Sequence, residues 1–403
     1  MKKALLIGWR SGAAQAVQAV GYAPTCIITP ADKAAALRAG FDDGLVTASD
    51  PADVEQVLAA LKRHSIDMAD FAAVGTNLER CMVTASTVGA LVGARSIPVH
   101  TAVLLRDKIA QKAAVGAAGL PVAACRVIDT LDELPTDPDG YPVVVKPLAG
   151  EGTRETHYLQ GAQDACRLVE ARPGNAGHGP WAVEEFIEGA ELQVDGVVRD
   201  GQLCALAVSR YLQNLIAIKT GGPVGGVLLN PEDHLRLYKQ ATDLTTAALT
   251  ALGHTDGVFH LEAFDQGHRL VFSECAGRVS GGLVREMLVR KLGLDLTAEW
   301  ARALVGTKPE IPVEPQDDLS YGFANLAASP GEIILMPTTA DVLRRDLVVE
   351  GAVELGPGHT APDQTTASNL RAGRFIASAE SEKAVEAAVH DTLAWFTSHT
   401  AVK

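Results

Sequence analysis

The stretch Tyr141–His157, YPVVVKPLAGEGTRETH, decides how the chain is interpreted. Three consecutive valines at 143–145 predict a short buried strand that ends at Lys146. A flexible loop with a neighbouring hydroxyl group follows, formed by Gly150, Gly152 and Thr153. Such a loop lets backbone N–H groups approach an anion closely. A cation at a strand end before a glycine loop therefore indicates a phosphate-binding site.

This stretch taken alone also has an ordinary structural explanation. It lacks the G-x-x-x-x-G-K-[ST] spacing of a Walker loop, so any phosphate site belongs to another fold. The same sequence would fit a strand whose final lysine extends along the surface and is followed by a simple turn. The segments downstream have to decide between these two interpretations.

Composition and charge restrict the class of protein. A chain of 403 residues predicts about two to three domains, and 47% hydrophobic with 21% charged residues indicates a well-packed globular protein. A net charge of −14 argues against a nucleic-acid partner. The six cysteines form no C-x-x-C pair, which favours reduced thiols in the cytoplasm. No apolar run is long enough to span a membrane, and the N-terminal run reads as a strand.

The first hundred residues predict a Rossmann-like unit. A strand at 4–7 leads through Gly8 and Gly12 into a helix, but these glycines do not fit the dinucleotide pattern G-x-G-x-x-G. The strand at 25–29 has no acidic residue at its end to bind a ribose, so no nicotinamide cofactor is expected. Glu79, in GTNLER, is expected to be a favourable charge at a helix N-terminus.

Several elements follow from periodicity and turn residues. The runs 192–198 and 203–209 predict a hairpin about the turn 199–201, and 235–252 predicts a long helix. A linker is expected beyond about Thr307, and the final helix has Val385, Val389 and Phe396 on one face.

Two segments in the middle of the chain have unusual compositions, one rich in acidic residues and one rich in glycine. In EEFIEGAE, at 184–191, four carboxylates surround an apolar strand, which is costly unless some of them bind a ligand. We expect Glu185 and Glu188 to face water. The glycine-rich stretch 220–226 indicates either mobility or a close approach of the backbone to its neighbours, and a loop that covers a substrate is one such arrangement.

A pair of acidic strands follows. In the strand 257–264, the alternation of side chains places His260 and Glu262 on one face. An antiparallel partner at 270–276 would bring Glu274 beside Glu262. Two adjacent carboxylates suit a shared Mg²⁺ ion. The alternative explanation is a hairpin whose carboxylates form salt bridges with Arg278 or Arg269.

Taken in order, these parts resemble the ATP-grasp superfamily over nearly the whole chain. The carrying motifs are Arg106-Asp-Lys108, VVVKP with its glycine loop, EEFIEGAE, and the acidic strand paired with ECAGRVSGG. Within the superfamily the chain looks most like the carboxylate–amine ligases that join L-amino acids into dipeptides. The resemblance implies an α/β fold, α+β in parts. It has a Rossmann-like pre-ATP-grasp domain at 1–101, an ATP-grasp domain at 102–308 with its lid at about 115–187, and a C-terminal α+β region at 309–403.

The resemblance also implies roles for individual residues. Lys108 and Lys146 match the lysines on the ATP phosphates, and Gly150, Gly152 and Thr153 match the flap above them. Around the nucleoside, Glu184 matches the residue that accepts a hydrogen bond from the adenine amine, and Glu191 matches the residue that binds the ribose. Phe186 and Ile187 match the backbone hinge between them. Glu262 and Glu274 match the Mg²⁺ ligands. Arg278 and Lys146 match the cations that take part in catalysis. Ala276 stands where the family usually has a metal-binding Asn.

The implied reaction forms an amide bond. ATP would phosphorylate a carboxylate to an acyl phosphate, which an amine would attack, releasing ADP and phosphate. The implied cofactors are ATP and Mg²⁺, with Mn²⁺ as the substitute. The implied partners are small carboxylates and amines, and a second copy in a homodimer.

Other functions are open at this stage. A purine-biosynthetic or biotin-carboxylase-like ATP-grasp enzyme would activate formate or bicarbonate. An ATP-binding sensor without catalysis is a non-enzymatic alternative, which Ala276 supports and the retained Glu262, Glu274 and Arg278 oppose.

Overall fold

The N-terminal unit is a four-stranded parallel sheet with helices around it. The structure, a computed structural model, describes residues 1–135, 137–172 and 178–403 of the chain. The sheet has the order β3-β2-β1-β4, which confirms the predicted Rossmann-like unit. Its elements are β1 (Lys3–Ile7), α1 (Ala13–Ala19), β2 (Ala23–Ile28), α2 (Lys33–Arg38), β3 (Leu45–Thr47), α3 (Val54–Arg63), β4 (Phe71–Gly75), α4 (Met82–Val92) and α5 (Val99–Leu104).

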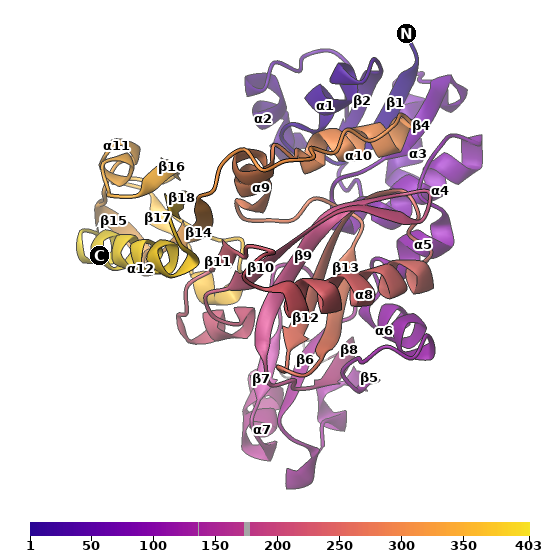
Figure 1. Cartoon of the computed structure of the whole chain (residues 1–403). Coiled ribbons are helices and arrows are strands. Elements are labelled where there is room, and N and C mark those ends of the chain that lie inside the picture. Colours follow the sequence, from indigo (N-terminus) through magenta and orange to yellow (C-terminus); the bar gives the residue numbers. More distant parts are fainter. Residues whose placement is uncertain (136, 173–177) are drawn as a thin grey trace.

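A second, antiparallel sheet contains most of the stretch 141–157, and we call it the lid after the expectation for residues 115–187. Its order is β5-β8-β6-β7, and α6 (Lys108–Ala117) leads into it. The valine run becomes the inner strand β6, as predicted, because β-branched side chains pack well in a pleated sheet. The lid lies at the bottom of Figure 1, and its elements are β5 (Cys125–Thr130), β6 (Val143–Pro147), β7 (His157–Leu159), α7 (Ala162–Glu170) and β8 (His178–Glu185).

The largest sheet has eight antiparallel strands in the order β13-β12-β9-β10-β11-β14-β18-β16. These are β9 (Ala190–Arg199), β10 (Gln202–Tyr211), β11 (Gly225–Leu228), β12 (Gly257–Asp265), β13 (Leu270–Ala276), β14 (Ser320–Leu326), β16 (Val348–Val353) and β18 (Gly373–Ala379). β9 and β10 form the predicted hairpin, and both turn residues, Asp200 and Gly201, have positive φ angles of 51° and 72°. Gly225 and Gly226 lie in β11, where a Cβ atom at Gly225 would lie 2.5 Å from the Phe323 carbonyl oxygen. Of the two alternatives for 220–226, close backbone approach therefore holds for these glycines, and a loop over the whole stretch does not.

Helices cover the eight-stranded sheet and connect it to the other units. The long helix α8 (Leu235–Leu252) packs its apolar side against β9 and β12, as Figure 1 shows. α9 (Val284–Leu292) and α10 (Leu296–Val305) return to the N-terminal unit, where the indole of Trp300 donates a hydrogen bond to the Thr76 carbonyl. Among the described helices, none has the length and apolar character needed to cross a membrane.

The last ninety residues extend the eight-stranded sheet across the predicted boundary at 308. β14, β18 and β16 are its outer strands, and β15 (Gly331–Leu335) forms a small sheet with β17 (Thr360–Ala361) and β19 (Ala401–Val402). α11 (Thr339–Leu343) and α12 (Glu382–Ser398) pack against them, and the predicted apolar face of α12, with Val385, Val389 and Phe396, is fully buried. The linker after Thr307 lacks regular structure, as predicted.

Gly196, in the middle of β9, tests the packing of the large sheet. A Cβ atom here would overlap the Ala205 carbonyl oxygen and lie 2.7 Å from Cζ of Phe259. We expect Gly196→Ala to lower the free energy of unfolding by about 3 kcal/mol, because overpacking a rigid core forces the backbone to move. Urea unfolding monitored by tryptophan fluorescence measures this change. Gly161→Ala is the control, since its Cβ meets nothing within 4 Å; equal midpoints for the two variants would contradict the packing.

Candidate active site

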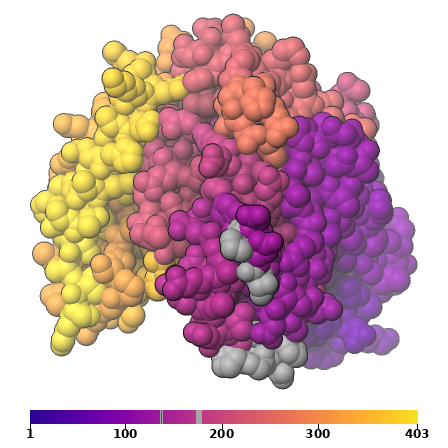
Figure 2. Space-filling view, turned by 90° about the horizontal axis from the view of Figure 1, so that it is seen from below, coloured from indigo at the N-terminus to yellow at the C-terminus, as the bar shows by residue number. Residues whose placement is uncertain are grey.

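One cavity of about 510 Å³ lies where all parts of the chain meet. It is lined by the lid loop, by the ends of β12 and β13, by the N-terminal unit, and by residues 368–374 of the C-terminal region. Figure 2 shows the lid between the N-terminal unit on one side and the C-terminal region on the other. All of the predicted site residues line this cavity: Lys108, Lys146, Gly150, Gly152, Thr153, Glu184, Phe186, Ile187, Glu191, Glu262, Glu274 and Arg278.

The two predicted metal-binding glutamates are direct neighbours. β12 and β13 pair with Glu262 opposite Glu274, as the alternation predicts. The Lys108 ammonium lies 2.7 Å from Glu274, and the Tyr211 hydroxyl donates to Glu262 at 3.0 Å. Burial acts to raise the pKa of Glu274, but Lys108 and then Lys146 outweigh it and hold the pKa below its usual value. Both carboxylates are thus available as hard oxygen ligands.

Two strand positions beside them carry His260 and Ala276, which pair across the hairpin. His260 has an acidic partner at each ring nitrogen. Asp195, in β9, lies 3.0 Å from its Nδ1, and Glu262 lies 3.4 Å from its Nε2. Burial opposes the charge of His260, but the Asp195 carboxylate outweighs it and raises the pKa to about 10. The buried pair of Asp195 and His260 therefore helps to orient the Glu262 carboxylate. Ala276 stands where ATP-grasp sequences usually have an Asn, and its methyl side chain gives the imidazole no hydrogen-bond partner.

Glu184 lies between two lysines rather than standing free. Lys146 is 2.8 Å and Lys112 is 3.3 Å from its carboxylate oxygens. Lys112 is fully buried, and burial lowers its pKa while Glu184 opposes the shift. For Lys146 burial also acts to lower the pKa, but Glu184 and then Glu274 outweigh it and raise the pKa. Lys146 is therefore held as a cation between Glu184 and Glu274.

The glycine loop presents free donors toward the cavity. In the described chain, the backbone N–H groups of Glu151, Gly152 and Thr153 have no hydrogen-bond acceptor, and the buried Thr153 hydroxyl has no partner. The Gly150 carbonyl accepts from Lys108 at 3.2 Å. The Gly152 carbonyl accepts from the backbone N–H of Ser368 at 2.9 Å, which joins the loop to the C-terminal region. Successive free N–H groups form an anion-binding concavity.

The EEFIEGAE segment has two buried and two exposed carboxylates. Glu185 and Glu188 are exposed, as expected, whereas Glu184 and Glu191 are buried. Glu191 accepts from the backbone N–H of Leu215 at 2.6 Å. Burial, and then the charge of Glu262, raises the pKa of Glu191 to about 8. This carboxyl group is therefore more easily protonated than an ordinary glutamate.

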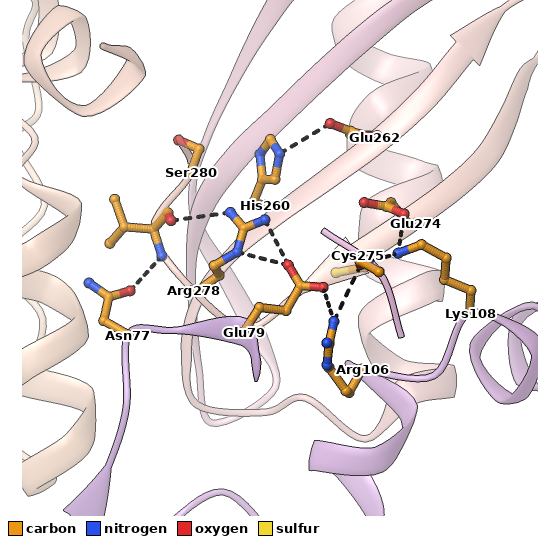
Figure 3. Close-up of polar contacts among 12 residues, drawn as sticks. Asn77, Glu79, Arg106, Lys108, His260, Glu262, Glu274, Cys275, Arg278 and Ser280 are labelled. Carbon is orange, nitrogen blue, oxygen red and sulfur yellow. Dashed lines mark hydrogen bonds and ion pairs between the residues drawn. The ribbon is translucent and has the colours of Figure 1, made fainter. Parts of the chain in front are cut away.

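Glu79 has a different role from the expected helix charge. It lies in the short 3-10 helix Glu79–Cys81, and its carboxylate is buried between two arginines, 2.8 Å from Nη2 of Arg278 and 3.1 Å from Nη1 of Arg106. Figure 3 shows this carboxylate at the centre of the network. Arg106 also donates to the Gly150 carbonyl at 3.3 Å. Glu79 thus joins the N-terminal unit to Arg278 and to the glycine loop.

Several cavity residues carry no signal in the sequence. Lys112 looks like any helix lysine, and the arginines near the glycine turn at 281–282 come from distant segments. Ser368 and its neighbours lie in a stretch without a recognisable motif. The residues missed are Arg10, Glu79, Lys112, Asp195, Ser368, Asn369, Arg371 and Arg374.

The residues present fit a nucleotide triphosphate with Mg²⁺. Three unpaired N–H groups, two lysines and a free hydroxyl converge on one end of the cavity, which suits phosphate oxygens. Within residues 1–135, 137–172 and 178–403, no three His, Cys, Asp or Glu side chains form a metal-binding group. Mg²⁺ commonly binds proteins through one or two carboxylates and completes its shell with phosphates and water. The pair Glu262 and Glu274 satisfies that requirement.

The Glu79 network yields a stability prediction. Glu79→Gln leaves the buried guanidinium groups of Arg106 and Arg278 without a counter-charge, so the free energy of unfolding should fall by about 3 kcal/mol. Thermal and urea unfolding measure the loss. The control Glu188→Gln changes an exposed carboxylate and should leave stability within about 0.5 kcal/mol. If both variants are equally stable, Glu79 does not hold the two arginines.

Sequence comparison places the chain beside amide-forming ligases. No protein-family model matches the chain. An L-arginine-specific L-amino acid ligase from Bacillus subtilis is 24% identical over 291 residues, which are 69% of this chain and 68% of that protein. A D-alanine–D-alanine ligase from Granulibacter bethesdensis is 34% identical over 158 residues, or 38% of this chain and half of that protein.

Solved structures share the fold over the full length. The L-amino acid ligase from Bacillus licheniformis superposes with a TM-score of 0.76 at 18% identity, covering 100% of this chain and 99% of that one. A carboxyaminoimidazole ribonucleotide synthase from Aspergillus clavatus, complexed with ATP, has a TM-score of 0.75 at 15% identity and covers 98% and 99%. The chain therefore has the ATP-grasp fold that its sequence predicts, and its sequence is similar to those of amide-forming ligases.

Proposed function

We propose that this protein joins two small molecules, with amino acids as the preferred substrates, by phosphorylating a carboxylate with ATP and coupling it to an amine. The observation that carries the proposal is the pairing of Glu262 with Glu274 beside Lys108 and Lys146, next to a loop with free N–H groups. Similarity to two amino-acid-joining ligases supports the choice of substrates.

The reaction needs positioned charges rather than an enzyme nucleophile. A carboxylate oxygen of the first substrate attacks the γ-phosphorus, the bond to the bridging oxygen breaks, and ADP leaves. The neutral amine of the second substrate then attacks the carbonyl carbon of the acyl phosphate. Phosphate leaves with the C–O electron pair, and the nitrogen loses a proton to solvent. Orientation and charge neutralisation account for most catalysis of such phosphoryl transfers.

Different residues of the cavity would bind the phosphates, the Mg²⁺ ion and the nucleoside. Lys108, Lys146 and the amides of 151–153 would bind the phosphates, and Glu262 with Glu274 would hold Mg²⁺, which neutralises charge on the phosphate oxygens. Arg278, fixed by Glu79, would stabilise the charge that develops on the transferred group. Glu184 and Glu191 would bind the nucleoside, with Phe186 and Ile187 as the hinge. The pairing of Glu184 with Lys112 and Lys146 would then place the adenine amine close to both lysines.

A second candidate is the carboxylating class predicted as the nearest rival. It is favoured by the TM-score of 0.75 to a carboxyaminoimidazole ribonucleotide synthase, nearly the value of the amino acid ligase. Both likenesses are below 20% identity and concern the fold alone. The longer sequence match is to an L-amino acid ligase, and we therefore give the amide-forming reaction precedence.

The release of ADP and phosphate, assayed with MgATP and an array of amino acids singly and in pairs, tests the proposal. We expect release to require a carboxylate and an amine together, with an amide product in the mass spectrum. The array includes bicarbonate and formate. Release with either of these alone, or with no acceptor at all, would contradict an amine ligase.

A matched pair of variants tests the metal site in the same assay. Glu274→Gln removes one of the paired carboxylates and should lower the maximal rate by about 10³-fold or more, since charge neutralisation dominates this chemistry. Glu188→Gln, which changes an exposed acid outside the cavity lining, should keep the normal rate. Circular dichroism checks that both variants fold. Near-normal turnover of Glu274→Gln would remove this residue from the metal site.

A further inference from the structure

A second cavity, of about 310 Å³, lies between the N-terminal unit and the central sheet. Its wall is formed by the end of β4, by α4 and α10, by residues 94–98, by the turn 253–257 after α8, and by Gly277. None of these residues lines the cavity of the candidate active site. An apolar cavity of about 150 Å³ holds one benzene molecule, so this space has room for a molecule of two rings.

Most of the wall of the second cavity is apolar. Met82, Ala85 and Trp300 are buried members of this wall. The indole N–H of Trp300 is already used, because it donates to the Thr76 carbonyl at 3.1 Å. Aromatic rings and methionine sulfur atoms both make favourable contacts with an aromatic partner. The wall therefore favours an aromatic ligand.

The wall also contains a buried acceptor that lacks a donor. His254 is 2% exposed, and its Nε2 lies 3.0 Å from the Val258 carbonyl oxygen. A carbonyl only accepts, so Nε2 carries the proton and Nδ1 keeps a free lone pair. Burial lowers the pKa of His254 more than the Val258 carbonyl raises it, so the ring stays neutral. In the part of the chain that the structure describes, no donor reaches Nδ1.

A buried hydroxyl group adds a second polar position. Ser86, on α4, is 2% exposed, and across residues 1–135, 137–172 and 178–403 its hydroxyl has no hydrogen-bond partner. The charged groups of the wall, by contrast, are engaged with one another: Asp256 lies 3.5 Å from Arg95 and 3.1 Å from Arg199. Unpaired buried polar groups cost free energy, which a ligand with an N–H or O–H group would recover. The cavity thus suits a neutral ligand with a hydrogen-bond donor.

The second cavity adjoins the segments that carry the catalytic groups. A Cβ atom at Gly277 would lie 3.4 Å from Cε1 of His254, so this ring packs against the backbone directly before Arg278. Asn77 follows a residue of the cavity wall and accepts from the N–H of Val279 at 2.9 Å (Figure 3). A ligand that displaces either wall segment therefore displaces Arg278 as well.

We propose that the second cavity is a regulatory site for a neutral aromatic molecule of one or two rings whose N–H or O–H group donates to Nδ1 of His254, and that its binding is coupled to nucleotide binding through Gly277. The inference goes beyond the ligase reaction, because it involves no residue of the active-site cavity. Coupling is reciprocal: the ligand changes the affinity for the nucleotide by the same factor by which the nucleotide changes the affinity for the ligand.

The first experiment compares probes that differ only in the donor. Indole is compared with N-methylindole, and phenol with anisole, by calorimetric titration of the full chain. We expect indole to bind about tenfold more tightly than N-methylindole, which corresponds to one buried hydrogen bond. Equal binding within both pairs would contradict the bond to His254. If none of the four probes binds, the cavity serves only water and the inference is overturned.

Variants show whether the probe occupies the second cavity. Ala85→Leu fills the space and should weaken indole binding about tenfold or more, whereas Ala90→Leu, at an exposed position of the same helix outside both cavities, should not. His254→Phe keeps a ring but removes Nδ1, so indole and N-methylindole should then bind alike. This variant also provides the test if thermal unfolding shows that Ala85→Leu does not fold. Unchanged indole binding in Ala85→Leu and His254→Phe would overturn the assignment.

The coupling is measured with MgCl₂ and a non-hydrolysable ATP analogue. Saturating indole should change the dissociation constant of the analogue by about fivefold or more. Ala90→Leu should keep this change and Ala85→Leu should lose it. An unchanged dissociation constant with indole bound would overturn the regulatory role. Because the measurement needs no catalysis, a failure to release ADP would contradict the proposed ligase function and leave this test intact.

Discussion

The repulsion between Glu262 and Glu274 is the constraint on which the rest of the site depends. The antiparallel register of β12 and β13 places these carboxylates side by side at the wall of a buried cavity. Two like charges in such a place need cations close by. Lys108 at the start of α6 supplies one within 2.7 Å, and Lys146 at the end of β6 adds to the field. The lid, the central sheet and α6 are therefore held to one arrangement by electrostatics.

The sequence predicted those parts whose information is local. Periodicity and turn residues located β6, the β9–β10 hairpin, α8 and the pairing of β12 with β13, and the order of motifs indicated the fold. Arg10, Glu79 and Lys112 escaped because their meaning depends on partners far away in the chain. Glu79 meets Arg278 across 199 positions, and no spacing rule connects them. For the glycine stretch 220–226 the sequence left mobility and close backbone approach open, and the structure shows close approach at Gly225 and Gly226, where neighbouring β-strands leave little room for a side chain.

The site is a junction, and each part contributes a different property. The lid loop offers N–H groups, the central sheet offers carboxylates, and the N-terminal unit offers Glu79 and Arg10. The C-terminal region closes the cavity through Ser368 and adds Arg374. ATP-grasp proteins with different reactions share this architecture at low identity. Differences in substrate must then come from side chains at the junction, where Arg10 and Arg374 lie, rather than from the fold.

The fate of the substrate oxygen tests the account most directly. If the carboxylate is activated by phosphorylation, a substrate labelled with ¹⁸O in its carboxylate transfers one labelled oxygen to the released phosphate, because the acyl C–O bond breaks when the amine attacks. Mass spectrometry of the phosphate measures this transfer. We expect one ¹⁸O atom per phosphate formed with the amide product. Phosphate that carries no label, with turnover intact, would show that ATP is hydrolysed or used elsewhere and would contradict the acyl phosphate route.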